Sequence, residues 1–259
     1  MDEFPAGPHM SVLLRPAIAL AYAACTVCTA SASDFKVLAP NAAKEAVTAA
    51  IAAGETSASC RAVVQWSGTE AITKRIADGV AVDVVVNASH SIEQQSREGL
   101  LAGHTRTDFA RSGIGVAVPG DSARPDVSTT ESLKSALLSA RTVVVSSGTS
   151  GRHMVEVFGR LGISDQMKSK TKQPPSGSQI ADFLASGEAD LGFQQMSELL
   201  HAKGIHFLGP VPPELQNYTI YSGVLHAGAS NVACGRELLT ALRSAPVQGV
   251  VRSIGMEPL

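Results

Sequence analysis

Small hydroxyl residues and glycines lie between a strand pattern and a helix pattern in residues 143–161, VVVSSGTSGRHMVEVFGRL. The β-branched residues that open this stretch predict a strand, and Val155, Phe158 and Leu161 recur at the spacing of one helix face. The first amides of a helix have no partner within the helix, and the helix dipole places partial positive charge there. The turn Ser147–Gly151 therefore predicts a helix start that binds an anion.

The residues of this turn offer several donors to an anion. Thr149 and Ser150 carry hydroxyl groups, and the backbone N–H groups of Gly151 and Arg152 follow them. An arginine that faces a site grips a carboxylate through two parallel hydrogen bonds. An exposed Arg152 at the start of the helix is an equally favoured interpretation.

Two earlier helix starts repeat this arrangement. Asn41 follows an apolar strand pattern and is a good N-cap, and Thr69 follows a second strand in the turn Ser67–Thr69. Ordinary capping is the competing explanation for each. Lys44 falls in the first turn of its helix, where a cation opposes the helix dipole. A buried Lys44 would therefore indicate an anion nearby, and a solvent-exposed Lys44 is the alternative. Glu70 either complements the dipole of its helix or accepts a proton from a ligand.

A fourth candidate lies at the end of a strand, in residues 187–195, GEADLGFQQ. Gln194 and Gln195 follow the apolar part of this pattern, at the carboxyl end of the strand, where open α/β sheets bind their ligands. An amide there donates to an oxyanion, and an exposed surface amide is the alternative. Together, the four places predict a receptor for a small anion.

Composition limits the function classes. The chain has 259 residues, a formal net charge of -2 and 4% aromatic residues. Nucleic-acid binding needs a basic stripe and is not predicted, and so few aromatic rings disfavour a sugar site. The motifs of P-loops, dinucleotide sites and nucleophile elbows are missing, and we expect no cofactor. His153 and Glu156 lie three apart on a helix, but two ligands make no metal site, so no metal is predicted.

The first 32 residues have the pattern of a secretory signal peptide, with a basic residue, an apolar core at 17–24 and a small-x-small site that ends at Ala32. We expect cleavage near Ala32 and a periplasmic protein. The apolar core is too short for a stable membrane span, so no membrane insertion is expected. Cys60 and Cys234 remain after cleavage. Export permits a disulfide between them, and two buried thiols fit the sequence equally.

Strand and helix patterns alternate along the rest of the chain, which predicts an α/β fold. The nearly continuous apolar run at 82–86 is typical of a central parallel strand covered on both faces. The predicted strands are 35–38, 61–66, 82–86, 114–118, 142–145, 189–193, 205–208 and 218–225, and the predicted helices are 42–53, 71–77, 89–98, 133–138, 154–161, 179–184, 196–200 and 232–243.

Two α/β series with a returning C-terminal part predict two lobes that close on a ligand. We expect residues 33–114 plus 220–259 to form one lobe and residues 115–219 the other, with crossing strands near 111–118 and 217–225. A single doubly wound sheet is the alternative.

Four landmarks carry a family resemblance: the helix start at Asn41, the run SGTEAITKRIADG ending in VDVVVNAS, the SGTSG turn and the GEADLGF strand. They resemble bacterial periplasmic type II solute-binding proteins, specifically the molybdate-binding-protein-like group. The resemblance covers residues 35–256. It implies a two-lobed periplasmic-binding-protein-like α/β fold, a ligand cleft between the lobes and an ABC importer, through its permease, as partner.

The resemblance also implies oxyanion contacts at Asn41, Thr69, Thr149, Ser150 and Gln195. Molybdate receptors of this group usually have Ser at the position of Asn41 and Tyr at that of Gln195. Their pockets hold a dianion with neutral donors alone.

Charged residues flank these positions here, namely Lys44, Glu70, Arg152 and His153. We therefore expect an organic di- or tricarboxylate to be favoured over a molybdate-type oxyanion. The chain also resembles periplasmic aconitate isomerases, which implies an alternative function as an enzyme that moves a proton along an allylic system. In that case Arg152 and Lys44 would clamp the carboxylates, and Glu70 or His153 would transfer the proton.

Overall fold

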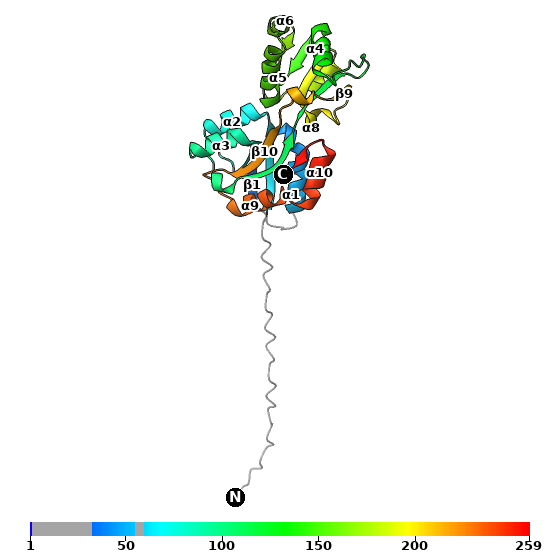
Figure 1. The fold of residues 1–259 in the computed structure, drawn as a ribbon. Helices are drawn as coiled ribbons and strands as arrows, with labels where there is room; N and C mark the ends of the chain where they lie inside the picture. The colour runs from blue at the N-terminus through cyan, green and yellow to red at the C-terminus, as the bar shows by residue number, and fades with distance from the viewer. Residues whose placement is uncertain (2–32, 55–59) are drawn as a thin grey trace. The chain divides into compact units, whose positions relative to one another are not determined.

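The computed structural model describes Met1 and residues 33–54 and 60–259. Apart from Met1, the predicted signal peptide lies outside the described residues. The described chain forms a mixed α/β fold with two separate sheets, which confirms the predicted class (Figure 1). The first sheet has the strand order β11-β4-β10-β3-β1-β2. Its strands are β1 (Ser33–Pro40), β2 (Cys60–Ser67), β3 (Val84–Ala88), β4 (Thr107–Ser112), β10 (Thr219–Leu225) and β11 (Glu257–Pro258).

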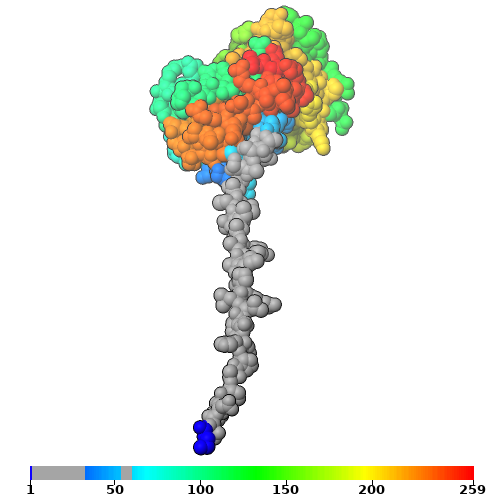
Figure 2. Space-filling model, turned by 90° about the horizontal axis from the view of Figure 1, so that it is seen from below, coloured from blue at the N-terminus to red at the C-terminus, as the bar shows by residue number. Residues whose placement is uncertain are grey.

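Helices cover both faces of the first sheet because β1 and β3 alternate the direction of their apolar side chains. Val37, Val84 and Val86 pack in one core cluster, whereas Leu38 and Val85 pack in another on the opposite face. The first cluster includes helices α1 (Lys44–Gly54), α9 (Val232–Ala241) and α10 (Ala245–Ser253), and the second includes α2 (Thr69–Ala77) and α3 (Ser89–Arg97). In Figure 2, α9 and α10 appear in orange to red on one face of the molecule.

The second sheet has the strand order β7-β6-β8-β5-β9 and also carries helices on both faces. Its strands are β5 (Ile114–Pro119), β6 (Val143–Val145), β7 (Thr171–Lys172), β8 (Leu191–Gln195) and β9 (Ile205–Pro210). One face packs against α4 (Thr130–Ser139), α5 (Thr149–Arg160) and α6 (Ser164–Lys168), and the other against α7 (Ile180–Ala185) and α8 (Met196–Leu199).

Two connections join the sheets. Gly113 alone separates β4 from β5, and residues 211–218, which include the 3-10 helix η3 (Pro213–Leu215), separate β9 from β10. The Gln216 side chain ties the two connections together, because it accepts a hydrogen bond from Ile114 N at 2.7 Å and donates one to Ile114 O at 3.0 Å. Gly113 lies inside the first predicted crossing, 111–118. The second connection, 211–218, begins before the second predicted crossing, 217–225. The lobe boundaries themselves remain a prediction.

Local differences from the sequence-based expectations have simple causes. Of the three residues expected on one face of α5, Phe158 and Leu161 are buried but Val155 is 47% exposed, and Met154 and Val157 complete the buried face. The helix expected from residue 42 begins as the 3-10 helix η1 (Asn41–Ala43). The short elements β7, β11 and α6 were not predicted, nor were β4, α10 and the 3-10 helix η2 (Gly103–Thr105). Two-residue strands have no period to detect, since their neighbours define them.

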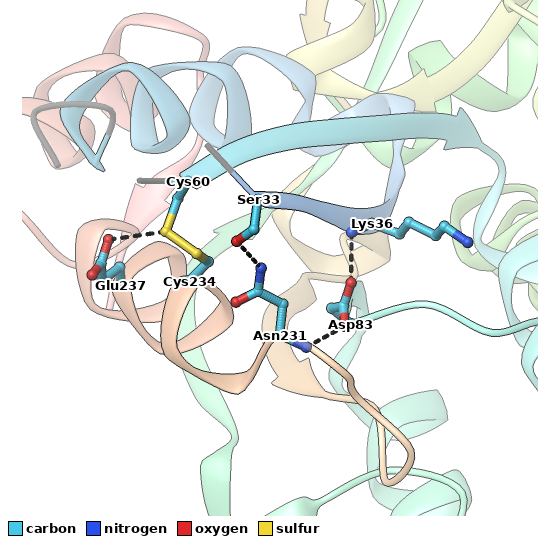
Figure 3. Close-up of a disulfide and its surroundings, with 7 residues drawn as sticks. All are labelled: Ser33, Lys36, Cys60, Asp83, Asn231, Cys234 and Glu237. Atoms are coloured by element: carbon cyan, nitrogen blue, oxygen red, sulfur yellow. Dashed lines mark hydrogen bonds between the residues drawn. A yellow bond between two sulfur atoms is a disulfide. The ribbon is translucent and has the colours of Figure 1, made fainter. Parts of the chain in front are cut away.

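The expected strand at 82–86 begins only at Val84, because Asp83 has a structural role of its own (Figure 3). Its buried carboxylate accepts hydrogen bonds from Lys36 N at 2.7 Å and from Ser230 N and Asn231 N, both at 2.8 Å. Burial raises the pKa of Asp83, but the backbone donors outweigh it and hold the pKa below its usual value. This ionised carboxylate joins β1 to the turn before α9.

Cys60 and Cys234 form a disulfide beside this turn (Figure 3). The bond connects the first residue of β2 with α9, across 174 positions of sequence. Of the two interpretations that the sequence left open, the structure therefore selects the disulfide. Within the described ranges, none of the helices combines the length and apolar character needed to cross a membrane.

Candidate functional site

A cavity of about 430 Å³, its open mouth included, lies between elements of the two sheets. Its lining combines the starts of α2 and α5 with the loop that precedes α7 and with the carboxyl end of β8. Nearly all of the polar groups that line it are neutral hydroxyls and amides. The lining residues are Pro40, Asn41, Ala42, Ser67, Gly68, Thr69, Ser146, Ser147, Gly148, Thr149, Ser150, Pro175, Ser176, Gly177, Ser178, Gln194, Gln195, Glu198 and Tyr221.

The N-cap residues of the two long helices at this cavity provide no side-chain cap, and serine hydroxyls from outside the helices reach one first-turn amide in each, Ala71 N and Gly151 N. The N-cap residues are Gly68 for α2 and Gly148 for α5, and neither has a side chain to accept a hydrogen bond from the first turn. The first backbone bonds within the helices come from Ile72 N and Arg152 N. The amides before them belong to a helix end with partial positive charge, and Thr69 and Thr149 themselves line the cavity. Within the described residues, the first two amides of each helix, at Thr69, Glu70, Thr149 and Ser150, have no hydrogen-bond partner, and such amides suit an anion.

Three buried oxygen atoms at the cavity have no hydrogen-bond partner within the described part of the chain. They are Ser147 Oγ, Thr149 Oγ1 and Gln195 Oε1. The Gln195 amide nitrogen donates to Thr219 Oγ1 at 2.9 Å. Because a threonine hydroxyl both donates and accepts, the exchanged amide orientation is equally compatible and turns the donor toward the cavity. A buried polar group without a partner costs about 1–3 kcal/mol, so these atoms fit a site that holds a polar ligand.

Five of the predicted ligand residues line this cavity, namely Asn41, Thr69, Thr149, Ser150 and Gln195. Gly151 does not line it. Its N–H donates to Ser146 Oγ at 3.2 Å, and a Cβ built on it would lie 1.6 Å from Ser146 O. Only glycine fits there, and its function is to let the start of α5 approach the end of β6.

The four charged candidates lie outside the cavity lining. Arg152 pairs with Glu70, so the two charges that were expected near the ligand neutralise each other. The His153 ring nitrogen Nε2 lies 2.8 Å from Leu215 O, and Nδ1 lies 4.0 Å from Glu156. Lys44 lines a neighbouring groove, with its ammonium 6.0 Å from the centre of the Trp66 ring.

Several lining residues were missed from the sequence. Ser176, Gly177 and Ser178 come from the run PPSGS, which signals a turn but gives no indication of what the turn faces. Glu198 belongs to α8, a helix too short for a clear period, and Tyr221 lies in β10. Burial raises the pKa of Glu198 to about 8, and burial likewise raises that of Tyr221. Both groups therefore favour the neutral form at neutral pH.

Contacts between segments that pack beside the first sheet and segments that pack beside the second surround the cavity. The Asn41 side chain donates to Gly177 O at 3.1 Å, and Ala71 N donates to Ser176 Oγ at 3.2 Å. The Arg152–Glu70 ion pair adds a third contact. Helices and loops from beside both sheets thus border the cavity, which presents hydroxyls, amides and helix starts to its ligand.

Known proteins resemble this chain in sequence and in fold. An aconitate isomerase from Pseudomonas sp. is 30% identical over 191 residues, which cover 73% of this chain and 72% of the relative. The periplasmic molybdate-binding protein of Azotobacter vinelandii superimposes with a TM-score of 0.73 at 16% identity, over 86% of this chain and 98% of that chain. A periplasmic binding protein of A. tumefaciens R10 in complex with agropinic acid gives a TM-score of 0.66 at 14% identity, over 87% and 83% of the two chains.

At such low identity the two structures show a common fold only, that of the two-lobed periplasmic binding proteins. The family model for bacterial extracellular solute-binding proteins matches residues 35–257, which is nearly the whole described chain. The chain belongs to the family of bacterial extracellular solute-binding proteins.

Proposed function

We propose that this protein captures a small organic di- or tricarboxylate in the cavity between its lobes. The observation that carries the proposal is the pair of helix starts, α2 and α5, whose first two amides have no partner among the described residues, at a cavity with unpartnered buried oxygens. One carboxylate of the ligand would accept hydrogen bonds from the amides and hydroxyls at these two helix starts. We further propose that the protein is exported to the periplasm and delivers its ligand to the permease of an ABC importer.

Because the charged candidates do not line the cavity, the proposed preference for a polycarboxylate over a compact oxyanion depends on a groove that adjoins the cavity. Asn41, Gly177 and Glu198 line both. The groove measures about 1160 Å³ with its open side included, and its lining contains two lysines, Lys44 and Lys203, together with the carboxyl groups of Glu45, Asp182 and Glu198. A tetrahedral oxyanion needs only the cavity. A ligand with further carboxylates extends into the groove, where the ammonium groups provide charge-assisted hydrogen bonds.

Replacement of Lys44 tests this extension. We expect Lys44→Met to weaken the binding of a tricarboxylate such as trans-aconitate about tenfold, because one charge-assisted hydrogen bond contributes about 1.5 kcal/mol or more. Binding of molybdate or sulfate should change much less. Calorimetry gives the affinities. Trp66, the only tryptophan, lies beside Lys44 and provides a fluorescence signal for the same titration.

Lys74→Met is the matched control, since Lys74 pairs with Asp78 at the surface and lines neither the cavity nor the groove. This variant should bind every anion as the wild type does. Wild-type tricarboxylate affinity in Lys44→Met would contradict the groove as a subsite. Tight binding of molybdate alone would replace the proposed ligand class.

A second candidate function is the isomerisation of aconitate, which two observations favour. The 30% identical relative is named an aconitate isomerase, and Glu198 places in the cavity a carboxyl group that exchanges its proton near neutral pH. The reaction breaks one allylic C–H bond, transfers the proton to a base and returns a proton to the other end of the allylic system. Glu70 and His153 lie outside the cavity lining, which makes Glu198 the better placed carboxyl for this transfer.

NMR of the protein with cis- or trans-aconitate separates the two functions. For a receptor, we expect stoichiometric binding and no interconversion of the isomers. Interconversion that survives Glu70→Gln and His153→Ala but is lost in Glu198→Gln would establish the isomerase with Glu198 as its acid–base group. Loss of turnover in Glu70→Gln or His153→Ala would instead assign proton transfer to those residues.

A further inference from the structure

We infer that Glu198 is a neutral carboxylic acid that donates a hydrogen bond to the bound anion, so that ligand capture is coupled to a proton. The inference rests on the proposed function and adds a pH dependence to it. Among the residues that line the cavity, Glu198 is the one whose protonation state decides whether the site attracts or repels an anion. As an acid it is a donor, and as a carboxylate it repels an anion.

The hydrogen bonds around Glu198 indicate which oxygen carries the proton. The Gln194 carbonyl oxygen Oε1 accepts from Ile180 N at 3.0 Å, which fixes the orientation of the amide. Its nitrogen Nε2 therefore donates, and it does so to Glu198 Oε1 at 2.8 Å. Either form of the carboxyl group accepts this bond, but in the acid form an oxygen that accepts from an amide acts as the carbonyl oxygen. In the acid form the proton therefore belongs on Oε2, and we place Oε2 as the donor to the ligand because Glu198 lines the cavity.

The charges around this carboxyl do not stabilise its ionised form strongly. Burial, the largest effect, raises the pKa of Glu198 to about 8, and Glu45 raises it further, whereas a hydrogen bond from Gln179 lowers it. The titratable groups that share the groove or the cavity with Glu198 come from α1, α7, β10 and the segment after α8. They are Lys44, Glu45, Asp182, His201, Lys203 and Tyr221. Neither lysine is among the groups that lower the pKa.

Ligand binding should follow the protonation of this one residue. Below its pKa the cavity offers neutral donors only, and an anion binds without repulsion. Above its pKa a negative charge appears beside the anion, and affinity falls by up to tenfold for each further pH unit. By linkage, a bound anion raises the pKa of Glu198 and so stabilises its protonated form.

The test measures trans-aconitate affinity from about pH 7 to about pH 9.5, a range in which the ligand's own carboxylates stay ionised. We expect the wild-type dissociation constant to rise about tenfold or more. Glu198→Gln keeps a neutral amide of similar shape at every pH, so its affinity should change less than about twofold over the range. Asp182→Asn is the matched control, because it removes a carboxylate from the groove and should keep the wild-type slope.

A flat wild-type profile, or a Glu198→Gln variant that keeps the wild-type slope, would overturn the inference. A second measurement does not need a ligand. In protein with ¹³C-labelled glutamate carboxyls, the signal that disappears in Glu198→Gln should titrate well above the usual glutamate range. A titration within that range would also overturn the inference. If no carboxylate or oxyanion binds at any pH, the proposed function fails, and the carboxyl titration still decides the state of Glu198.

Discussion

A Gly68→Ala variant is expected to bind its anion about 10- to 100-fold more weakly than the wild type, with little change in the stability of the ligand-free protein. A Cβ at Gly68 would lie 2.2 Å from Ser176 Oγ and 2.4 Å from Gly177 N. Gly68 precedes α2 beside the first sheet, whereas Ser176 and Gly177 precede α7 beside the second. The methyl group therefore obstructs the approach of the two lobes rather than the folding of either.

The backbone of Gly68 does not itself need glycine, because its φ of -87° and ψ of 156° are ordinary extended values. The cost of the substitution thus falls on the closed arrangement, where crowding costs about 1–3 kcal/mol, and the lobes relieve it by separating. A loss of 100-fold corresponds to about 2.7 kcal/mol. Calorimetric binding and thermal unfolding of the ligand-free variant measure the two effects separately.

Two other glycines provide the controls. Gly249 lies in α10 with nothing within 4 Å of a built Cβ, so Gly249→Ala should bind normally. Gly151 contacts Ser146 of its own lobe, so Gly151→Ala should lose stability as well as binding. Wild-type affinity in Gly68→Ala would show that the lobes need not approach this closely to hold the ligand.

The fold class and the helix starts were predictable because they depend on local pattern. The apolar period of two or of 3.6 residues identifies a buried strand such as β3 or a helix such as α2, whatever the rest of the chain does. Turns of small polar residues after strands then indicate Thr69 and Thr149 as cavity residues. Both line the cavity, because the geometry of a strand followed by a helix fixes where the helix begins.

The directions of long charged side chains were not predictable, because partners distant in sequence decide them. Arg152 pairs with Glu70 from the other lobe, and no local pattern indicates that pair. Lys44 reaches the adjoining groove rather than the cavity. Glu198 was overlooked because it lies in the four-residue helix α8, and its place at the cavity depends on other elements that pack around it. The chemistry of the site therefore needs the three-dimensional arrangement, even though its position does not.

Loss of the Cys60–Cys234 disulfide should have the largest effect on stability. The bond closes a loop of 174 positions that includes the whole second sheet, so it removes much of the freedom of the unfolded chain. For a loop of this length, the chain-entropy model gives a stabilisation of about 5 kcal/mol. We expect Cys60→Ala with Cys234→Ala to lower the melting temperature by about 10–20 °C, as calorimetry or circular dichroism would measure.

The disulfide lies away from the cavity, since neither cysteine is among the residues that line it. The double variant should therefore bind its anion with wild-type affinity at temperatures where it is folded, which separates this effect from that of Gly68→Ala. Treatment with a reductant provides the control. It should lower the melting temperature of the wild type toward that of the double variant and leave the double variant unchanged. Two results together would contradict this prediction: a double variant as stable as the wild type, and a wild-type melting temperature that does not change with a reductant able to reach the bond. They would mean that the packing of α9 and β2 holds the first sheet without the bond.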